Sequence, residues 1–489
     1  MRVGAASLLV AVALGAAGCG GGGGGGSLPA AAEVVTADAP VLISFKTDFS
    51  SEQWTNAQAL LRKFPGAGDL LRRASVEAGN VDFERDVKPA LGPEVDVVWL
   101  DFANGGNNVV GLTRPKDKAK FEALIAKANS TGSGKAVTGE VNGWTVVADS
   151  RSKIDGFRRA SSGDMLSEVG EFKDAMKQLD EQAAVRAYVA GAPVQRELDR
   201  ALDQAGAPPN LTRDLARMES ISAQGLVEGD GVRVDSALAT DPAANPKTVK
   251  PTLADSLPVG AVLYVATADL SAPTRTILEL VGRSKPKFET QLRQVQTVLG
   301  LSLEQDVYPL LSGEQALAVY AAKPIPKIVF LTKVPDENKA RELVAHVVEL
   351  FKIGAGLSVS TFDVGGVSVS DVSQPGSSVH VYIAVGRGKL IVTTARDTLP
   401  ALIEGTGEKL ADDQLYKQAL ADAKVPSKVV GMAYADLVHG LPFAFDLAEA
   451  NGSQVPPEAR ANTEPLSHAQ LYAEQDGNSF RLSGFLAIK

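Results

Sequence analysis

The amino-acid sequence predicts an α+β fold made of two tandem homologous domains, each a largely antiparallel sheet with helices packed on one face. The first observation is a self-match, in which Val81 to Leu100 (VDFERDVKPALGPEVDVVWL) returns without a gap as Leu301 to Tyr320 (LSLEQDVYPLLSGEQALAVY), at a constant offset (301 − 81 = 220). Such a self-match is typical of a repeated structural unit. The second observation is that pairs of alternating apolar and polar segments, joined by tight turns, are interspersed with segments of helical periodicity.

Length and composition agree with two globular domains. At 489 residues the chain is long for one hydrophobic core and comfortable for two. Its content of 45% hydrophobic and 22% charged residues is ordinary for a folded protein. The formal net charge of −9 argues against a surface built to neutralise phosphate backbones, so nucleic acid is not expected as a partner.

The N-terminus has the pattern of a secretory signal that ends at a cysteine. Arg2 supplies the positive charge, Ala5 to Ala17 form an apolar run, and small residues precede Cys19, the only cysteine of the chain. A membrane-spanning helix needs about 20 apolar residues, and this run is shorter. The segment resembles the bacterial lipobox, in which the cysteine receives a diacylglycerol and the preceding peptide bond is cut, although Ala16 stands where leucine is commoner.

We therefore expect a signal peptide at residues 1–18 and lipidation of Cys19. The mature protein would be exported and anchored to the outer face of the bacterial cytoplasmic membrane or elsewhere in the periplasm or cell envelope. The alternative is an ordinary secretory signal with an incidental cysteine. Residues 19–36, which begin with a run of glycines, are expected to be a tether.

Each copy is expected to open with a strand and two helices. The strand is Val41 to Lys46 in the first copy and Ala261 to Ala268 in the second. Apolar residues at helical spacing follow in both copies: Trp54, Ala57, Leu60, Leu61, Leu70 and Leu71, and then Ile277, Leu278, Leu280, Val281, Phe288, Leu292, Val295, Val298 and Leu299.

The repeated stretch is expected to form a short helix, a turn and a strand. Apolar residues four apart suggest a buried helical stripe, but Pro89 lacks an N–H group and disfavours helical geometry at Lys88. We therefore expect a helix that ends near Lys88, a tight turn from Pro89 onward, and a strand from Val95 to Asp101. Gln315 to Ala321 is the expected counterpart of that strand.

Further strands and helices complete each copy. The segments expected to be equivalent are the strands Asn108 to Thr113 and Lys327 to Thr332, helices beginning at Pro115 and Pro335, turns at Asn142-Gly143 and Gly365-Gly366, and closing hairpins from Ser222 to Leu238 and from His468 to Leu486. The first residues of the closing hairpins are 246 apart (468 − 222), and the last are 248 apart (486 − 238).

The expected domains are residues 37–240 and 256–489, separated by a proline-rich linker at 241–255. Within the copies the offset grows from 223 (363 − 140) to 245 (392 − 147), so the second copy contains additional residues. They include the alternating segments His380 to Val385 and Lys389 to Thr394. We predict an extra hairpin at about 380–394 in the second copy.

The sequence contains no recognisable catalytic, metal-binding or phosphate-binding pattern. All four histidines, His346, His380, His439 and His468, lie in the second copy, and none belongs to an H-E-x-x-H pattern. Gly132-Ser133-Gly134-Lys135 lacks the first glycine and the following Ser/Thr of a phosphate loop. We therefore expect no catalytic residues, no metal and no cofactor.

Three acidic residues and a proline that are shared by both copies lie within the repeated stretch. Glu84, Asp86, Pro89 and Glu94 recur as Glu304, Asp306, Pro309 and Glu314. The acids could coordinate a hard cation or pair with a basic partner. The structural interpretation, which we favour, is that they cap the short helix and satisfy backbone N–H groups at the turn.

The run from Asp86 to Glu94, with the pattern D-V-x-P-x-L-G-x-E, resembles a motif of a bacterial family of envelope proteins described only as a domain of unknown function. The run from Asp306 to Glu314 follows the same pattern with the glycine displaced to Gly313. The resemblance implies an envelope location and the two-copy fold, and it supplies no activity.

These observations favour a non-enzymatic, membrane-anchored lipoprotein whose domains bind an envelope protein, a cell-wall component or a lipid. One alternative is a carrier of lipids or other hydrophobic ligands, and another is a hydrolase with carboxylates in the cleft between the copies. A large apolar cavity would favour the carrier, converging carboxylates the hydrolase, and an exposed apolar patch the binding protein.

Overall fold

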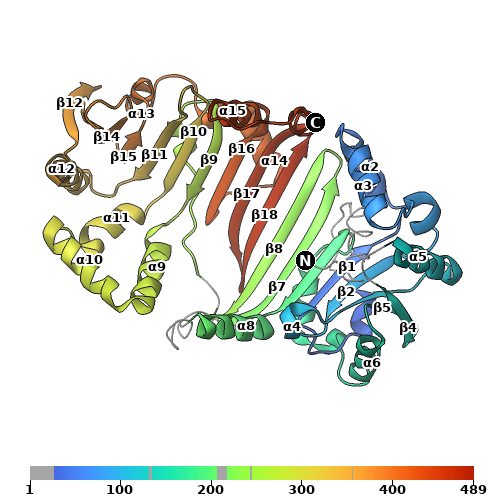
Figure 1. Ribbon diagram of the computed structural model, residues 1–489. Coiled ribbons are helices and arrows are strands. Elements are labelled where there is room, and N and C mark those ends of the chain that lie inside the picture. Colours follow the sequence, from blue (N-terminus) through green and yellow to red (C-terminus); the bar gives the residue numbers. More distant parts are fainter. Residues whose placement is uncertain (1–26, 132–134, 206–216, 243–244, 355) are drawn as a thin grey trace.

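The computed structural model of this protein describes residues 27–131, 135–205, 217–242, 245–354 and 356–489 (Figure 1). Within these residues, eighteen strands form one sheet in which every neighbouring pair is antiparallel, and helices accompany it. The predicted α+β class with antiparallel strands is confirmed. The structure adds that the two expected sheets are continuous with each other.

The strand order follows from the pairings of neighbouring strands. From one edge of the sheet to the other the strands are β4 (Val137–Val141), β5 (Trp144–Ala148), β3 (Val109–Thr113), β2 (Glu94–Trp99), β1 (Val41–Lys46), β6 (Val185–Ala190), β7 (Arg217–Glu228), β8 (Gly231–Asp241), β18 (Ser479–Ile488), β17 (Leu466–Asp476), β16 (Gly431–Asp436), β9 (Ala261–Thr267), β10 (Gln315–Tyr320), β11 (Lys327–Lys333), β15 (Lys389–Thr393), β14 (His380–Gly386), β13 (Val367–Ser373) and β12 (Ser358–Val364).

The sheet is arranged symmetrically about its centre, where β8 of the first half pairs with β18 of the second. Outward from this pair, both halves repeat the same order of strands, β7, β6, β1, β2, β3, β5 and β4 against β17, β16, β9, β10, β11, β15 and β14. The closing hairpins turn at Gly229-Asp230 and Gly477-Asn478, so structurally equivalent residues there are 248 apart (477 − 229), two more than at the start of the sequence match.

Asp235 and Ser483 are equivalent by this offset (483 − 235 = 248) and lie directly opposite each other in the β8–β18 pair. A local two-fold axis perpendicular to the sheet therefore passes between them. Because such an axis preserves the two sides of a sheet, equivalent elements of the two halves lie on the same side.

The folded part begins earlier than the sequence predicts. The short 3-10 helix η1 (Ala30–Glu33) lies within the expected tether, yet Ala31, Ala32 and Val35 are buried. Its equivalent, η4 (Leu253–Ser256), lies within the expected linker and buries Leu253 and Ala254. Both turns are too short to show periodicity, and small residues such as alanine give little apolar signal, so their packing could not be read from the pattern.

The second half has two more strands than the first. The segment expected as an extra hairpin at about 380–394 forms β14 and β15. β15 pairs with β11 as β5 pairs with β3, so β15 and β14 occupy the positions of β5 and β4. By this pairing, β12 and β13 are the strands without a counterpart.

Helices and helical turns connect the strands. They are α2 (Glu52–Arg62), α3 (Ala67–Glu77), η2 (Phe83–Val87), α4 (Ala103–Gly106), α5 (Lys118–Thr131), α6 (Arg151–Ala160), η3 (Leu166–Glu168), α7 (Gly170–Lys177), α8 (Gly191–Gln204), α9 (Ser271–Ser284), α10 (Pro286–Leu299), η5 (Leu303–Val307), α11 (Tyr308–Leu311), α12 (Glu337–Gly354), η6 (Arg396–Thr398), α13 (Leu399–Ile403), η7 (Leu410–Asp412), α14 (Gln414–Asp422), α15 (Leu437–Ala450) and α16 (Pro457–Thr463).

The two faces of the sheet are covered differently, and helices lie on both. On the first face, which we call the covered face, the two largest apolar clusters pack the sheet against α6 and α7 in the first half and against α13 and α14 in the second. On the opposite face, α5 packs over the outer strands of one half and α12 over those of the other. We call the part of this opposite face formed by β7, β8, β18 and β17 the open face.

Candidate functional site

The four central strands have the reverse of the usual polarity. On the covered face they carry mainly polar and charged side chains, including Glu228, Gln224, Arg233, Asp235, Arg481, Ser483, His468, Gln470 and Tyr472. On the open face they carry uncharged and mostly apolar residues, namely Ile221, Ala223, Gly225, Val227, Val232, Val234, Ser236, Leu238, Phe480, Leu482, Gly484, Leu486, Ile488, Ala469, Leu471, Ala473 and Gln475.

The open face leaves large apolar side chains in contact with solvent. Val234 is 53% exposed, Leu471 47% and Leu482 44%. Figure 1 shows the four long strands without a helix in front of them, between α15 at one end and α8 at the other. Exposed apolar side chains are normal when scattered, whereas neighbouring ones on a surface of a soluble protein mark an interaction site.

The apolar character continues across strands of both halves. A row of directly opposed residues runs along the open face and beyond it: Val185, Gly225, Val234, Gly484, Leu471, Ala433, Val265, Leu317 and Phe330. Gly484 leaves room in this row for a neighbour, because a Cβ atom built on it would lie 2.5 Å from a methyl carbon of Leu471.

On the covered face, Arg233 joins the two halves. Its Nε lies 2.8 Å from Glu228 Oε1, and its guanidinium donates to the carbonyl oxygens of Asp422 (2.6 Å) and Ala423 (3.0 Å) at the end of α14. Those carbonyls have no partner within the helix, and a cation is favourable at a helix C-terminus. Burial alone would raise the pKa of Glu228, but the hydrogen bonds and charges of Arg233 and Lys424 outweigh it and lower that pKa.

A cleft of about 880 Å³ lies beside this contact, at the junction of the halves. Four carboxylates line it, those of Glu52, Asp180, Glu228 and Asp235. Glu228 is held by Arg233 and Lys424, while Asp235 accepts a hydrogen bond of 2.9 Å from the Gln224 side-chain amide. These pairings favour a structural role over acid–base chemistry for both carboxylates.

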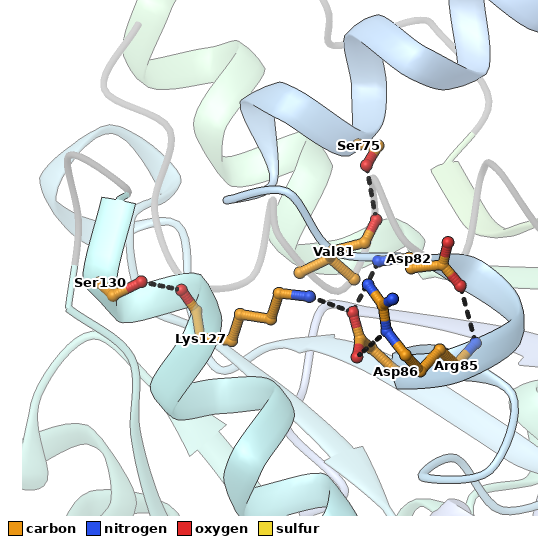
Figure 2. Close-up of polar contacts among 7 residues, drawn as sticks. All are labelled: Ser75, Val81, Asp82, Arg85, Asp86, Lys127 and Ser130. Carbon is orange, nitrogen blue, oxygen red and sulfur yellow. Dashed lines mark hydrogen bonds and ion pairs between the residues drawn. The ribbon is translucent and has the colours of Figure 1, made fainter.

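The aspartates of the repeated stretch serve the same local function in both copies. Asp86 accepts a hydrogen bond of 2.8 Å from the backbone N–H of Asp82, at the start of the π-helical turn η2, and pairs with Lys127 of α5 (Figure 2). Asp306 accepts one of 2.6 Å from the backbone N–H of Ser302, at the start of the π-helical turn η5.

Of the remaining shared residues, only Glu94 and Glu314 have different surroundings in the two halves. Glu84 and Glu304 are exposed, and Pro89 and Pro309 follow the π-helical turns. Glu314 is buried and accepts hydrogen bonds from the backbone N–H groups of Thr252 (2.6 Å) and Leu253 (2.7 Å), with Lys333 Nζ at 2.7 Å. Glu94 is the first residue of β2.

One buried charged group was not predicted from the sequence. Asp96 lies on the covered face of β2, opposite Ser44 of β1, which in turn lies opposite Arg186 of β6. Burial and the neighbouring Glu94 raise the pKa of Asp96 well above its usual value, and Arg186 opposes this rise. Arg186 also donates to the carbonyl oxygen of Ser27 (2.5 Å). Asp96 lies in the run EVDVVW. The strand pattern of this run indicates which face of the sheet Asp96 is on, but it does not indicate that the carboxyl group is buried.

Several predictions concern parts of the chain that the structure does not describe. The signal peptide, Cys19 and residues 132–134 of the glycine turn lie outside the described residues. Among the residues that are described, no group of three or more His, Cys, Asp or Glu side chains could hold a metal ion. No helix in the described ranges is both long and apolar enough to cross a membrane.

Comparison with known proteins identified one family. A family model described as "Protein of unknown function (DUF3352)" matches residues 151–486. No match to a curated protein was found. Among solved structures, crystal form IV of TP0453 has a TM-score of 0.26 at 12% identity, covering 50% of this chain and 81% of that chain. Crystal form III has a TM-score of 0.25 at 10% identity, with coverages of 50% and 79%. At this level of similarity we base no statement on them.

Proposed function

Because the chain belongs to the DUF3352 family, whose function is unknown, we propose from its own residues that it is a membrane-anchored lipoprotein of the bacterial cell envelope, and that it binds an apolar partner through its open face. The observation that carries this proposal is the reversed polarity of the central strands. Val234, Leu471 and Leu482 remain in water, while Arg233, His468 and Tyr472 are buried on the other side.

The energetic argument follows from the chemistry of the two faces. Each large aliphatic side chain transferred from water into an apolar environment contributes about 1.5–3 kcal/mol. A monomer that only had to fold would bury Val234 and leave the Arg233 charge in water. Neighbouring strands of both halves instead expose aliphatic side chains on the open face and bury polar ones on the covered face. This arrangement supports an open face that binds a partner.

The residues on the covered face support a non-enzymatic role. The carboxylates Glu228 and Asp235 are engaged by Arg233, Lys424 and Gln224, as described above. Burial lowers the pKa of His468, so its imidazole is neutral at physiological pH, and it lies 3.2 Å from the Asp422 carboxylate. Among these contacts, the hydrogen bond from Lys424 to Glu228 connects the halves, as do those from Arg233 to the end of α14.

The proposal is tested by photo-crosslinking in cells. A photoreactive residue placed at Val234 or Leu482 is expected to give covalent adducts with a partner. Ile325 provides a matched control, because it is a similarly exposed aliphatic residue (46%) in the connection between β10 and β11. Equal adduct yields at Val234, Leu482 and Ile325 would contradict binding at the open face.

The lipid anchor has a separate test. Intact-mass spectrometry of the membrane fraction is expected to show a chain that begins at Cys19 and carries the added mass of a diacylglycerol and its acyl groups. The Cys19→Ala variant is expected to lack that mass. A wild-type chain with no lipid mass would remove the lipoprotein part of the proposal.

A second candidate, a carrier of hydrophobic ligands, is favoured by one pocket. A pocket of about 420 Å³ between α15 and α16 is lined by apolar side chains that include Leu437, Leu441 and Phe445. Its volume lies within the usual range for small-molecule sites. Organic extraction of the purified protein followed by mass spectrometry is expected to recover a bound lipid if this candidate is correct, and none if it is not.

A further inference from the structure

Two helical hairpins, α2–α3 and α9–α10, keep apolar side chains in water. Ile277 of α9 is 59% exposed and Val298 of α10 is 79% exposed. In α3, Leu70 is 64% exposed, and Ala67 is the residue that the helix buries. Isolated helices of this length are marginal in water, and most helical stability in proteins comes from packing an apolar stripe. The exposed apolar side chains of these helices are therefore available to pack against a surface outside this chain.

The hairpins are equivalent in the two halves and lie on the same side of the sheet. Trp54 of α2 stacks on Phe83, with ring centroids 5.1 Å apart, and Phe83 packs against the apolar cluster that contains Val95, whose side chain is on the side of the open face. The local two-fold axis perpendicular to the sheet places α9–α10 on that side too. Figure 1 shows the two hairpins at opposite ends of the molecule, with the central strands between them.

The charge of α9–α10 differs in sign from that of the whole chain. Residues 271–299 contain five basic residues, Arg275, Arg283, Lys285, Lys287 and Arg293, and two acidic ones, Glu279 and Glu289, which gives +3. The chain as a whole has a formal net charge of −9. A basic amphipathic segment with exposed aliphatic side chains has the composition of a helix that lies in a membrane interface.

We propose that α9–α10, assisted by α2–α3, binds the surface of a membrane that contains anionic lipids. The basic side chains contact the head groups, and Ile277, Val298 and Leu70 enter the boundary of the acyl chains. This inference rests on the proposed function and names its partner as lipid, since the hairpins and the open face share one side of the molecule. A membrane anchor at Cys19 would keep the hairpins close to such a surface.

The test uses the full chain carrying Cys19→Ala, so that no acyl group contributes, and measures flotation with vesicles. Vesicles of phosphatidylcholine and phosphatidylglycerol in equal parts are expected to bind this protein, and vesicles of phosphatidylcholine alone to bind it more weakly. High salt is expected to weaken the binding because it screens the attraction of basic residues to anionic head groups. Equal binding to the two kinds of vesicle would overturn the inference.

Substitutions then locate the contact. Ile277→Asp with Val298→Asp is expected to weaken vesicle binding by at least about tenfold. Ile325→Asp with Val379→Asp is the matched control, because it adds the same charge at two exposed aliphatic positions outside the hairpins. All four positions are exposed, so far-UV circular dichroism should match that of the parent. Similar losses in the two double variants would contradict a specific contact.

The two proposals can fail separately. If vesicle binding does not depend on the hairpins while Val234 still forms adducts preferentially, the lipid inference is wrong and the proposed function stands. If adducts at Val234 and Leu482 are no more frequent than at Ile325, the proposed function is wrong whatever the vesicles show.

Discussion

Glu314, one of the residues shared by the two copies, has acquired a role that its counterpart lacks. Its buried carboxylate fixes the backbone of Thr252 and Leu253, where η4 begins. The sequence identified this position by its recurrence alone. It did not distinguish Glu314 from the exposed Glu304 ten residues earlier, because both are acids in the same repeated stretch.

This difference predicts that alanine substitutions at Glu314 and Glu304 have unequal effects on stability. Glu314→Ala leaves the buried N–H group of Leu253 and the partly buried one of Thr252 without an acceptor, and is expected to lower the free energy of unfolding by about 2–4 kcal/mol. Glu304→Ala removes an exposed side chain and is expected to change it by less than about 0.5 kcal/mol. Chemical denaturation measures both values. A loss from Glu314→Ala as small as the one expected from Glu304→Ala would show that the contacts of Glu314 contribute little stability.

Asp96 predicts a dependence of stability on pH. Because burial raises its pKa in the folded protein, the folded state binds the proton more tightly than the unfolded state, whose pKa is near 3.8. The resulting stabilisation is fully present below that value and is lost as pH rises through the raised pKa. Asp96→Asn, which stays neutral, is expected to gain stability relative to wild type between pH 4 and pH 8. Thermal unfolding at both values provides the measurement, and a constant difference would contradict this prediction.

At the scale of elements, the sequence located β16 by its alternating side chains, and it located β2 and β3, which are buried on both faces, by their apolar runs. It could not assign the faces of the central strands. In β8, Val232 and Val234 alternate with Arg233 and Asp235, and period two separates these sets without saying which of them faces water. Apolar residues of a strand usually face the core, but in β8 the valines face the solvent, because α14 and α7 cover the side that carries Arg233 and Asp235.

The contact between the β7–β8 hairpin and α14 predicts an asymmetry between equivalent arginines. Arg233 is 8% exposed and holds the end of α14, whereas its equivalent Arg481 is 32% exposed and reaches Asp476 (2.9 Å) and the Gln178 side chain (3.4 Å). Arg233→Met leaves Glu228 partly buried without its main partner and is expected to cost about 3 kcal/mol. Arg481→Met is expected to cost less than about 1 kcal/mol.

Urea denaturation of the two methionine variants measures these costs. Hydrogen exchange is expected to increase at the end of α14 in the Arg233 variant, since its terminal carbonyls lose their donors. A larger loss from Arg481→Met than from Arg233→Met would contradict the role assigned to Arg233.

At the scale of the whole molecule, the repeated stretch correctly indicated two similar halves, but their union was not visible in the sequence. The pairing of β8 with β18 joins segments more than two hundred residues apart, and no local pattern specifies a partner at that distance. Each closing hairpin ends in a long strand whose outer edge would be open in an isolated half. Long open edges tend to pair with another strand, so joining the halves removes both edges at once.

The shared sheet predicts that the halves stay together after the chain is cut. A protease site inserted between Asn245 and Pro246 precedes Val249, whose backbone pairs with Val429, and should allow cleavage between the halves without disturbing β8 or η4. The fragments are expected to elute as one particle of unchanged mass in size-exclusion chromatography with light scattering, because the β8–β18 pairing and the contacts of Arg233 survive the cut. They are expected to separate in denaturant. Fragments that separate under native conditions would show that the linker, and not the continuous sheet, holds the two halves together.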